Sequence, residues 1–553
     1  MRGVIDSRAR GLGVLAVVTG ASTGLAVAGF DRLVREQSFD RVLRAPLWVQ
    51  AGAVPAGLLV AALVLRWVGH GATPSTADEY IKNFHDAEQR LDLAPVPARL
   101  LASAATLAGG AALGFEGPSI YLGAAIGSWW QRRFSRVFER TDAKALLVCG
   151  AAAGVAAIFK APATGVVFAL EVPYRQDLAR RMLLPAMFAA AASYVVFAAI
   201  NGTTPLFPIS GAPPFDLRDL GGAAALGIIG GGGARLFADA LQAAKKAASL
   251  SIAIRLPIAA VGLVGLFAAG RGLTGRSLMI GSGYQAIAWT LEPGHAVGVV
   301  LAVFALRAIA TSLAVWAGGV GGLFIPLVVQ GALVGSAMGV AVGAKDTTLF
   351  PLLGIAAFLG AGYRVPLAAV VFVAETTGRP GFVVPALIAA ASSQLLMGRA
   401  SVSAYQQDTR SGRLARRLSQ PITAALRTDA ATIPPDATVS ELYDHHILQL
   451  RLRVVPVVAG ATYVGMVTLD DVAGLSREEW ARTPVRDITH DDWPQADVSW
   501  TLARAVTAME AADVDRLPVL DAGQFVGVVT TGEILKLDAI LERAEEQGLA
   551  PPE

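Results

Sequence analysis

The chain has 553 residues, of which 54% are hydrophobic and only 16% are charged. Soluble proteins of this length carry about 25% charged residues, so the composition excludes an ordinary soluble protein and predicts a membrane domain. The basic residues are scattered and not interleaved with aromatic side chains, which argues against a nucleic-acid-binding surface. The single cysteine, Cys149, excludes an internal disulfide.

Apolar segments recur from about Gly11 to Met397. The basic first ten residues lack a convincing signal-peptide cleavage site, so we expect them to precede a first membrane helix. Many later segments are shorter than the roughly 20 residues that a simple spanning helix needs, and Gly and Pro interrupt several of them. A bilayer tolerates such broken helices only where their backbone lines a cavity inside the protein.

Two copies of one motif lie 208 residues apart in this region. Gly114–Pro118 reads Gly-Phe-Glu-Gly-Pro and Gly322–Pro326 reads Gly-Leu-Phe-Ile-Pro, and each proline is followed by a glycine five and nine residues later. Repeats with interrupted segments at matching positions are typical of secondary transporters. The spacing alone is compatible with parallel or inverted halves.

A second pair of motifs follows the first in the same order. Pro162 and Pro366 each precede a Val-Val-Phe run, with Glu171 and Glu375 nine residues after the proline. A base stands two residues before each proline, Lys160 in the first copy and its counterpart Arg364 in the second. Two matches in order make a chance repeat improbable and predict an internally duplicated membrane domain.

The end of the chain has a different character. Residues 409–553 carry 14 basic and 22 acidic residues, whereas residues 1–408 carry 32 basic and 21 acidic residues. Two short apolar strands, 453–458 and 516–520, contain a proline that is followed nine residues later by a glycine. Strands here alternate with helical stretches, which predicts a small duplicated α/β module.

The motif around Glu116 suggests an anion site. A proline in the first turn of a helix leaves neighbouring backbone N–H groups unpaired, and the helix start carries a partial positive charge. Such amides bind an anion without a full cation, and Gly322–Pro326 repeats the device. Glu116 is itself an anion inside this site, so we expect it to plug the site until it is protonated or displaced.

These motifs resemble those of the CLC family of chloride channels and transporters. Gly114–Pro118 is similar to the family's Gly-Lys/Arg-Glu-Gly-Pro, and Gly322–Pro326 to its Gly-x-Phe-x-Pro. Residues 150–162 are similar to its Gly-x-Ala-Ala-Gly…Phe-Asn-x-Pro stretch, and the tail resembles paired CBS domains. The resemblance implies an all-α polytopic membrane domain of two inverted repeats of broken helices, followed by a cytoplasmic α/β CBS pair, in a homodimer in the cell membrane with one pore per subunit. The domain boundaries that follow are 1–405 for the membrane domain, 406–420 for a linker, 421–480 for the first CBS repeat and 481–546 for the second.

The resemblance carries site residues over position by position. Glu116 becomes the gating glutamate, the amides of Leu323 and Phe324 hold the central anion, and the Tyr405 hydroxyl donates to it. The full anion site implied in this way comprises Ser75, Thr76, Phe115, Gly117, Leu323, Phe324 and Tyr405. The family's Gly-Ser-Gly-Ile-Pro reads Pro-Ser-Thr-Ala-Asp at 74–78, so either Ser75 or Thr76 supplies the pore hydroxyl, and Asp78 is expected to cap the helix that begins there.

Three departures from the family pattern bear on mechanism. Phe115 replaces a base beside the gate, and Lys160 replaces an asparagine, with Glu171, the anion or an aqueous vestibule as its candidate partners. Val172 stands where exchangers have a second acid that serves as the internal proton site, so this relay position is lost. We therefore expect passive, gated chloride conduction, with chloride/proton antiport as the alternative.

The resemblance implies a nucleotide site at Thr468 and Asp471, with a second copy at Thr530 and Glu533, so adenine nucleotide is a candidate ligand although no cofactor is required. The absence of a nucleophile triad, metal-ligand cluster or phosphate loop argues against an enzyme. A non-transporting membrane sensor that signals through the CBS pair is a further alternative. The expected partners are chloride or another small anion, membrane lipid and a second copy of the chain.

Overall fold

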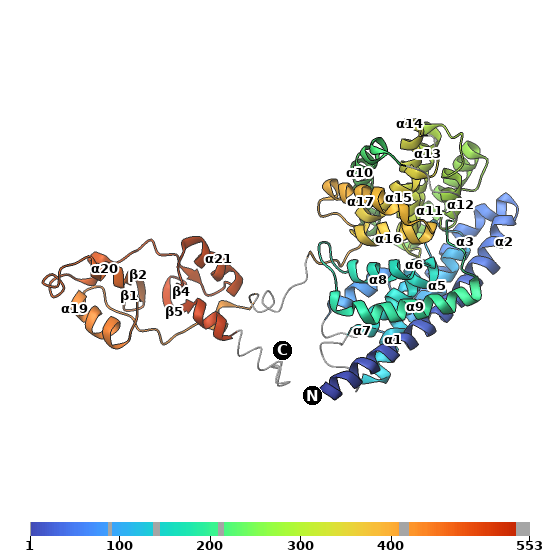
Figure 1. The fold of residues 1–553 in the computed structure, drawn as a ribbon. Coiled ribbons are helices and arrows are strands. Elements are labelled where there is room, and N and C mark those ends of the chain that lie inside the picture. The colour runs from blue at the N-terminus through green and yellow to red at the C-terminus, as the bar shows by residue number, and fades with distance from the viewer. Residues whose placement is uncertain are drawn as a thin grey trace. The chain divides into compact units, whose positions relative to one another are not determined.

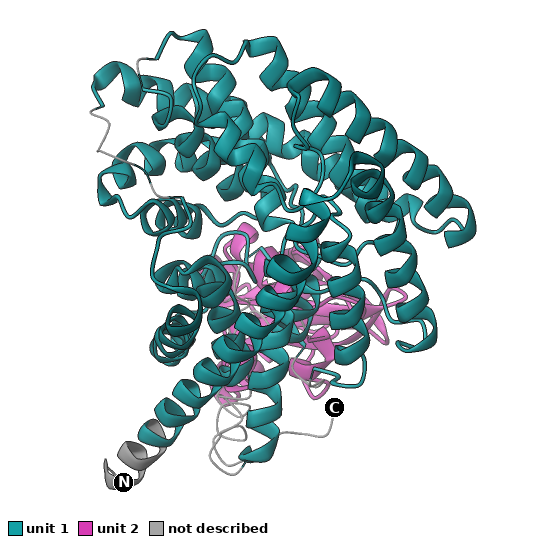
Figure 2. Cartoon of the chain, turned by 90° about the vertical axis from the view of Figure 1, so that its right-hand side faces the viewer, with its two compact units in different colours: residues 1–410 teal, residues 411–553 magenta. Residues whose placement is uncertain are grey.

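The computed structural model describes residues 2–537 apart from gaps at 87–90, 136–143, 208, 210–214, 345, 409–417 and 419. Most of the expected 406–420 linker, and the last residues expected for the second CBS repeat, lie outside the described residues. The chain divides into two compact units, residues 1–410 and 411–553, which Figure 2 colours separately.

The described part of the first unit is built almost entirely from helices (Figure 1). Eight helical segments in the described residues are long and apolar enough to cross a membrane. Five shorter apolar helices of 10–17 residues lie between them, which confirms the prediction of a polytopic domain of broken helices. The helices of the first half are α1 (Arg2–Asp31), which continues as a π-helix (Arg32–Phe39) into α2 (Asp40–Arg44), α3 (Leu47–Trp67), α4 (Ala77–His85), α5 (Val96–Ala108), α6 (Glu116–Arg133), α7 (Ala145–Phe159), α8 (Pro162–Glu171) and α9 (Leu183–Asn201). Those of the second half are α10 (Leu217–Ala247), α11 (Ile252–Thr274), α12 (Tyr284–Thr290), α13 (Val297–Trp316), α14 (Phe324–Ala341), α15 (Leu349–Gly362), α16 (Pro366–Thr377) and α17 (Val383–Met397).

The repeated glycines explain how the helices pack. Helix α6 packs on α7 and, in the second half, α14 packs on α15. A Cβ atom on Gly123 would collide with the carbonyl of Gly150, and one on Gly331 would collide with the carbonyl of Gly354. Small residues at these crossings let helix backbones approach closely, as in other membrane bundles.

The two halves meet through reciprocal contacts. Gly114 and Gly322 pair as an antiparallel bridge, with N–H···O distances of 2.9 and 2.7 Å. Glu171, at the end of α8, accepts hydrogen bonds from the first amides of α16, while Glu375, near the end of α16, accepts them from the first amides of α8. The two repeats therefore run antiparallel where they touch, which is the inverted arrangement.

The second unit contains a five-stranded mixed sheet in the order β1-β2-β5-β4-β3. Its strands are β1 (Val454–Ala459), β2 (Thr462–Thr468), β3 (Ala496–Asp497), β4 (Arg516–Asp521) and β5 (Gln524–Thr530). Its helices are α19 (Val439–Glu441), continued by a π-helix (Leu442–Gln449), α20 (Leu469–Ala473) and α21 (Leu502–Ala512). The β1–β2 and β4–β5 hairpins share one register, including a bulge at the same place, and each copy has its own hydrophobic core. The prediction of a duplicated α/β module is confirmed.

Candidate anion site and gate

Glu116 is the first residue of α6 and is completely buried. Its Oε1 accepts hydrogen bonds from the backbone N–H groups of Phe324 at 2.6 Å and Ile325 at 3.3 Å. Phe324 and Ile325 are the first two residues of α14, and Pro326 follows them. The first backbone N–H groups of a helix have no acceptor within that helix, so these two amides are available to Glu116. A carboxylate from one half thus occupies the amide site of the other.

The surroundings of this carboxylate are shaped by glycine. A Cβ on Gly114 or Gly322 would collide with the Glu116 carboxyl group. The second oxygen, Oε2, is buried and accepts no hydrogen bond from the described residues. Since a buried charged oxygen without a donor is costly, the carboxylate is held firmly on one side only.

The sequence placed the central anion at the amides of Leu323 and Phe324. The Glu116 carboxylate uses the amides of Phe324 and Ile325, so the placing of the central anion at Leu323 and Phe324 stays a prediction. Tyr363 is buried and was not among the expected site residues. Its place directly before Arg364, in the segment matched to Lys160, is the sequence signal that could have drawn attention to it.

A cavity of about 540 Å³ leads toward this site. Its lining includes the predicted residues Ser75, Thr76, Leu323 and Tyr405, together with Tyr363. Gly322 also lines the cavity and abuts the Glu116 carboxyl group, so Glu116 lies directly behind one wall of the cavity. The structure thus brings most of the expected anion site into one space.

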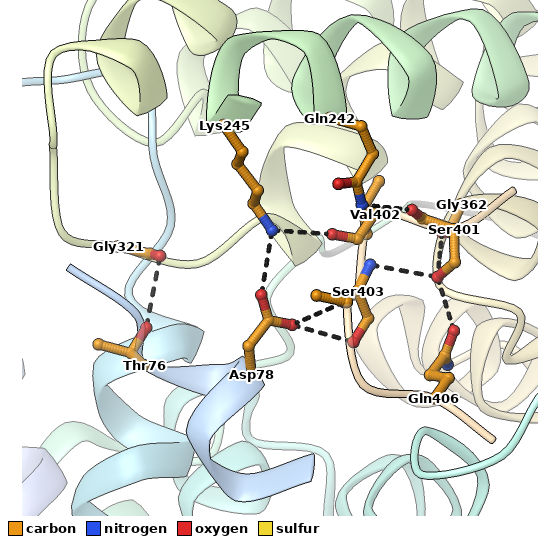
Figure 3. Close-up of polar contacts among 11 residues, drawn as sticks. Thr76, Asp78, Gln242, Lys245, Gly321, Gly362, Ser401, Val402, Ser403 and Gln406 are labelled. Carbon is orange, nitrogen blue, oxygen red and sulfur yellow. Dashed lines mark hydrogen bonds and ion pairs between the residues drawn. The ribbon is translucent and has the colours of Figure 1, made fainter. Parts of the chain in front are cut away.

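The two candidate pore hydroxyls are placed differently. Thr76 is buried and its Oγ1 donates to the Gly321 carbonyl at 3.5 Å, next to Gly117 (Figure 3). Ser75 is partly exposed to the cavity. Tyr405 has 45% of its surface exposed, and its ring lies 6.0 Å from the Lys82 ammonium group.

Asp78 does not cap its own helix, so that prediction was wrong. Thr76 is the N-cap of α4, and its side chain makes no capping hydrogen bond. The Asp78 carboxylate instead pairs with Lys245, at the end of α10, and with Ser403 (Figure 3). An ammonium group outcompetes a backbone N–H for a carboxylate because a charged donor makes the stronger hydrogen bond.

The three departures from the family pattern have physical explanations. Phe115 is buried, and its ring packs edge-on against Phe30 at 6.4 Å, so the lost base is replaced by a contact with α1. Val172 is buried at the end of α8, and its carbonyl accepts from the Gln406 side chain at 2.8 Å. Position 172 is therefore filled by packing and carries no proton-binding group.

Lys160 does not pair with Glu171, which was one of its candidate partners. Its Nζ donates to the carbonyl of Asn201, the last residue of α9, at 2.8 Å. Arg364 likewise donates to the carbonyl of Gly398, at the end of α17. Both bases have positive φ, 52° and 59°, and place a cation at the negative end of the equivalent helix. Their role is the same in both halves.

The expected nucleotide residues lie at the start of two helices in the second unit. Thr468 and Asp471 bond reciprocally as a capping box, and Glu533 N–H donates to Thr530 Oγ1 at 3.1 Å. His490, which the sequence did not single out, contacts Asp471 at 2.9 Å. This hydrogen bond raises the pKa of His490 above its ordinary value. Burial alone would raise the pKa of Asp471, but hydrogen bonds from Thr468 and His490 lower it overall.

A model of the voltage gated chloride channel family matches residues 56–398, and models of the CBS domain match residues 422–478 and 485–539. An H(+)/Cl(-) exchange transporter ClcA from Cronobacter sakazakii is 28% identical over 413 residues, which cover 69% of this chain and 85% of the relative. The corresponding transporter from Salmonella typhi is 27% identical and covers 69% of this chain and 84% of the relative.

Solved structures share the fold. A slow cyanobacterial Cl-/H+ antiporter has a TM-score of 0.61 at 21% identity and covers 70% of this chain and 94% of its own. A CLC-type fluoride/proton antiporter has a TM-score of 0.60 at 22% identity and covers 72% and 98%. A eukaryotic CLC transporter has a TM-score of 0.58 at 18% identity and covers 96% of this chain and 98% of its own.

Proposed function

This chain belongs to the voltage gated chloride channel family, a family of anion-transporting membrane proteins, and from that premise we propose that it exchanges chloride for protons. The position of the Glu116 carboxylate carries the proposal. That carboxylate occupies backbone amides that would otherwise be free to bind an anion. The site therefore holds either the chain's own carboxylate or a chloride ion.

Protonation decides which of the two is bound. A neutral carboxyl group is a weaker ligand for the positive end of α14 than a carboxylate, so protonated Glu116 yields its place to chloride. Returning to the amides, Glu116 releases its proton and displaces the anion. Because each ligand shifts the affinity of the site for the other, proton and chloride binding are linked.

The curated relatives favour exchange over the passive conduction that Val172 suggested. The matched bacterial proteins are named H(+)/Cl(-) exchange transporters, and two of the similar structures are described as antiporters. Val172 removes one carboxylate from the proton route but leaves Glu116 in place. The cavity ends at Gly322, which abuts the Glu116 carboxyl group, so solvent there brings a proton close to Glu116 without an acid at position 172.

Flux measurements on the purified protein in liposomes test this proposal. An imposed chloride gradient should drive protons uphill, in a fixed ratio to chloride. Replacing Glu116 with glutamine should abolish proton movement while chloride flux continues, because an amide cannot carry the proton. Glu292→Gln, which removes an exposed carboxylate paired with Arg276, is the matched control and should stay coupled. Chloride flux without proton movement in the unmodified protein would instead establish the passive channel.

We propose separately that the second unit binds adenine nucleotide, with Thr468 facing a phosphate and Asp471 the ribose. The adjacent hydroxyl and carboxylate at the start of α20 support this, since a hydroxyl can donate to a phosphate oxygen and a carboxylate can accept from ribose hydroxyls. Calorimetric titration of the full chain with ATP should give saturable heat that Asp471→Ala removes. The absence of heat with any adenine nucleotide at millimolar concentration would rule the proposal out. The homodimer that the family implies stays a prediction.

A further inference from the structure

Asp78, which lines the cavity, has a carboxylate held by donors from other parts of the chain (Figure 3). Asp78 Oδ2 accepts from Lys245 Nζ at 3.0 Å. Asp78 Oδ1 accepts from Ser403 Oγ at 2.9 Å and from the Ala404 N–H at 3.4 Å. Helix α4 supplies the acceptor, whereas α10 and the segment 401–405 supply the donors.

These donors are positioned independently of Asp78. Lys245 Nζ also donates to the Val402 carbonyl at 3.1 Å, and the Ser403 N–H donates to Ser401 Oγ at 3.1 Å (Figure 3). Ser401 in turn donates to the buried Gln406 side chain, which bonds to the carbonyls of Val172 and Tyr363. The segment is thus fixed by its own network, so its donors would remain convergent if the carboxylate left.

An ammonium group, a hydroxyl and a backbone N–H that point to one place can hold any small monovalent anion. None of these donors distinguishes a carboxylate oxygen from a halide ion. The side chains of Lys245 and Asp78 are 29% and 18% exposed, so solvent and ions reach them from the cavity. Leu323 and Tyr405, both expected to contact the transported anion, line the same cavity.

We propose that Lys245, Ser403 and Ala404 form an inner anion site that the Asp78 carboxylate occupies, and that a transported anion enters the cavity site by displacing this carboxylate. The arrangement parallels that of Glu116, in which a tethered carboxylate also fills a site made of donors from another element. It departs from the resembling motif, which has proline at the position of Asp78. The inference rests on the proposed function only in requiring that anions pass through the cavity.

The other charged groups at the cavity are engaged elsewhere. Glu79 pairs with Arg99 at 3.4 Å, Arg255 donates to the Trp316 carbonyl at 2.7 Å, and Lys82 lies over the Tyr405 ring. Lys245 is therefore the cation whose neutralisation depends on Asp78. A tethered group competes at a high effective concentration, so Asp78 should lower the apparent affinity of the cavity for chloride.

Bromide binding to the purified full-length protein tests the site directly. Asp78→Asn removes the competing charge, so we expect one additional bromide per chain in calorimetric titration and in anomalous diffraction, located between Lys245 and Ser403. The half-saturating chloride concentration for transport should fall by up to about fivefold, the upper end of what a partly exposed ion pair contributes. Adding Lys245→Met to Asp78→Asn should remove the extra bromide.

Two further variants separate an anion site from a structural ion pair. Lys245→Arg keeps the charge and should retain the wild-type half-saturation, whereas Ser403→Ala in the Asp78→Asn background should weaken the extra bromide. If Asp78→Asn binds no additional bromide and leaves half-saturation unchanged, the inference is wrong. If Asp78→Asn and Lys245→Met change half-saturation equally and in the same direction, the pair is merely structural. Bromide binding does not depend on proton coupling. The bromide measurement therefore tests the inner anion site even if the protein proves not to exchange protons.

Discussion

Two glutamates at equivalent positions show how single residues hold the repeats together. Glu171 accepts from the amides of Leu367 at 3.1 Å and Ala368 at 2.9 Å. Glu375 accepts from the amides of Ala163 at 2.9 Å and Thr164 at 2.7 Å. Each carboxylate therefore satisfies helix-start N–H groups that belong to the other half, where lipid and packed side chains offer no alternative partner.

Substitutions at Glu171 should separate this capping role from proton transfer. Glu171→Leu leaves two buried N–H groups unpaired and should destabilise the protein by about 2–3 kcal/mol. Glu171→Gln keeps an acceptor, so it should lose less stability and should stay proton-coupled. Melting of the purified protein in detergent, together with liposome flux, measures both effects. Equal melting temperatures for the two variants and the wild type would contradict the capping role, and loss of coupling in a stable Glu171→Gln protein would make Glu171 a proton carrier.

Residue-level predictions from the sequence were good where the chemistry was local. An association of Glu116 with helix-start amides could be expected from the Gly114–Pro118 motif, but the amides it uses, those of Phe324 and Ile325, belong to the other half of the domain. Asp78 was assigned to its own helix because Lys245, 167 residues away, cannot be placed beside it from the sequence. Tyr363 was missed for the same reason.

The crossing of α6 and α7 governs the position of the gate at the scale of elements. Helix α6 starts with Glu116, and its Gly123 lies against the carbonyl of Gly150 in α7. The second half repeats this crossing at Gly331 and Gly354. The separation of these helices thus sets where the Glu116 carboxylate lies relative to the amides of α14.

Gly150→Ala should move α6 and impair transport. The added Cβ would collide with the Gly123 carbonyl, and overpacking of this kind costs about 1–3 kcal/mol. Gly265→Ala, also within a helix but with open space around the added methyl group, is the matched control and should be neutral or slightly stabilising. Melting temperature and chloride flux report the two effects. A Gly150→Ala protein with wild-type stability and flux would show that α6 and α7 can move apart without loss of function.

The repeated motifs predicted the broken helices and the duplication, because glycine and proline spacing is written in the sequence itself. The antiparallel relation of the halves did not follow from the spacing and was supplied by the family resemblance. It becomes visible only through contacts across more than 190 residues, such as that of Glu171 with Leu367. Val172 alone suggested passive conduction, and the preference for exchange came from the names of the matched relatives.

At the scale of the whole molecule, the two units have separate hydrophobic cores, so each should respond to its own perturbations. In the second unit His490, on the segment before β3, bonds to Asp471 in the first turn of α20. Its pKa is raised in the folded protein by the hydrogen bond to Asp471. A raised histidine pKa means that the folded state binds the proton more tightly than the unfolded state.

The stability of the second unit should therefore depend on pH in a defined direction. The contribution of protonated His490 is fully present below its ordinary pKa of about 6.5 and is lost as the pH rises through the raised value. His490→Gln should flatten this dependence while leaving chloride flux unchanged. Thermal melting of the second unit across this pH range, followed by tryptophan fluorescence, measures the effect. An unchanged pH dependence in His490→Gln would contradict the assignment.

The Gly114–Gly322 bridge has a consequence for how the protein is made. During synthesis the ribosome delivers Gly114, Glu116 and the start of α8 roughly 200 residues before their partners on α14 and α16. Until then, the N–H of Gly114 and the first amides of α8 lack the acceptors that they have in the finished protein. The first half must therefore persist in the bilayer as a partly folded intermediate. The anion site forms only when the second half inserts and packs against the first.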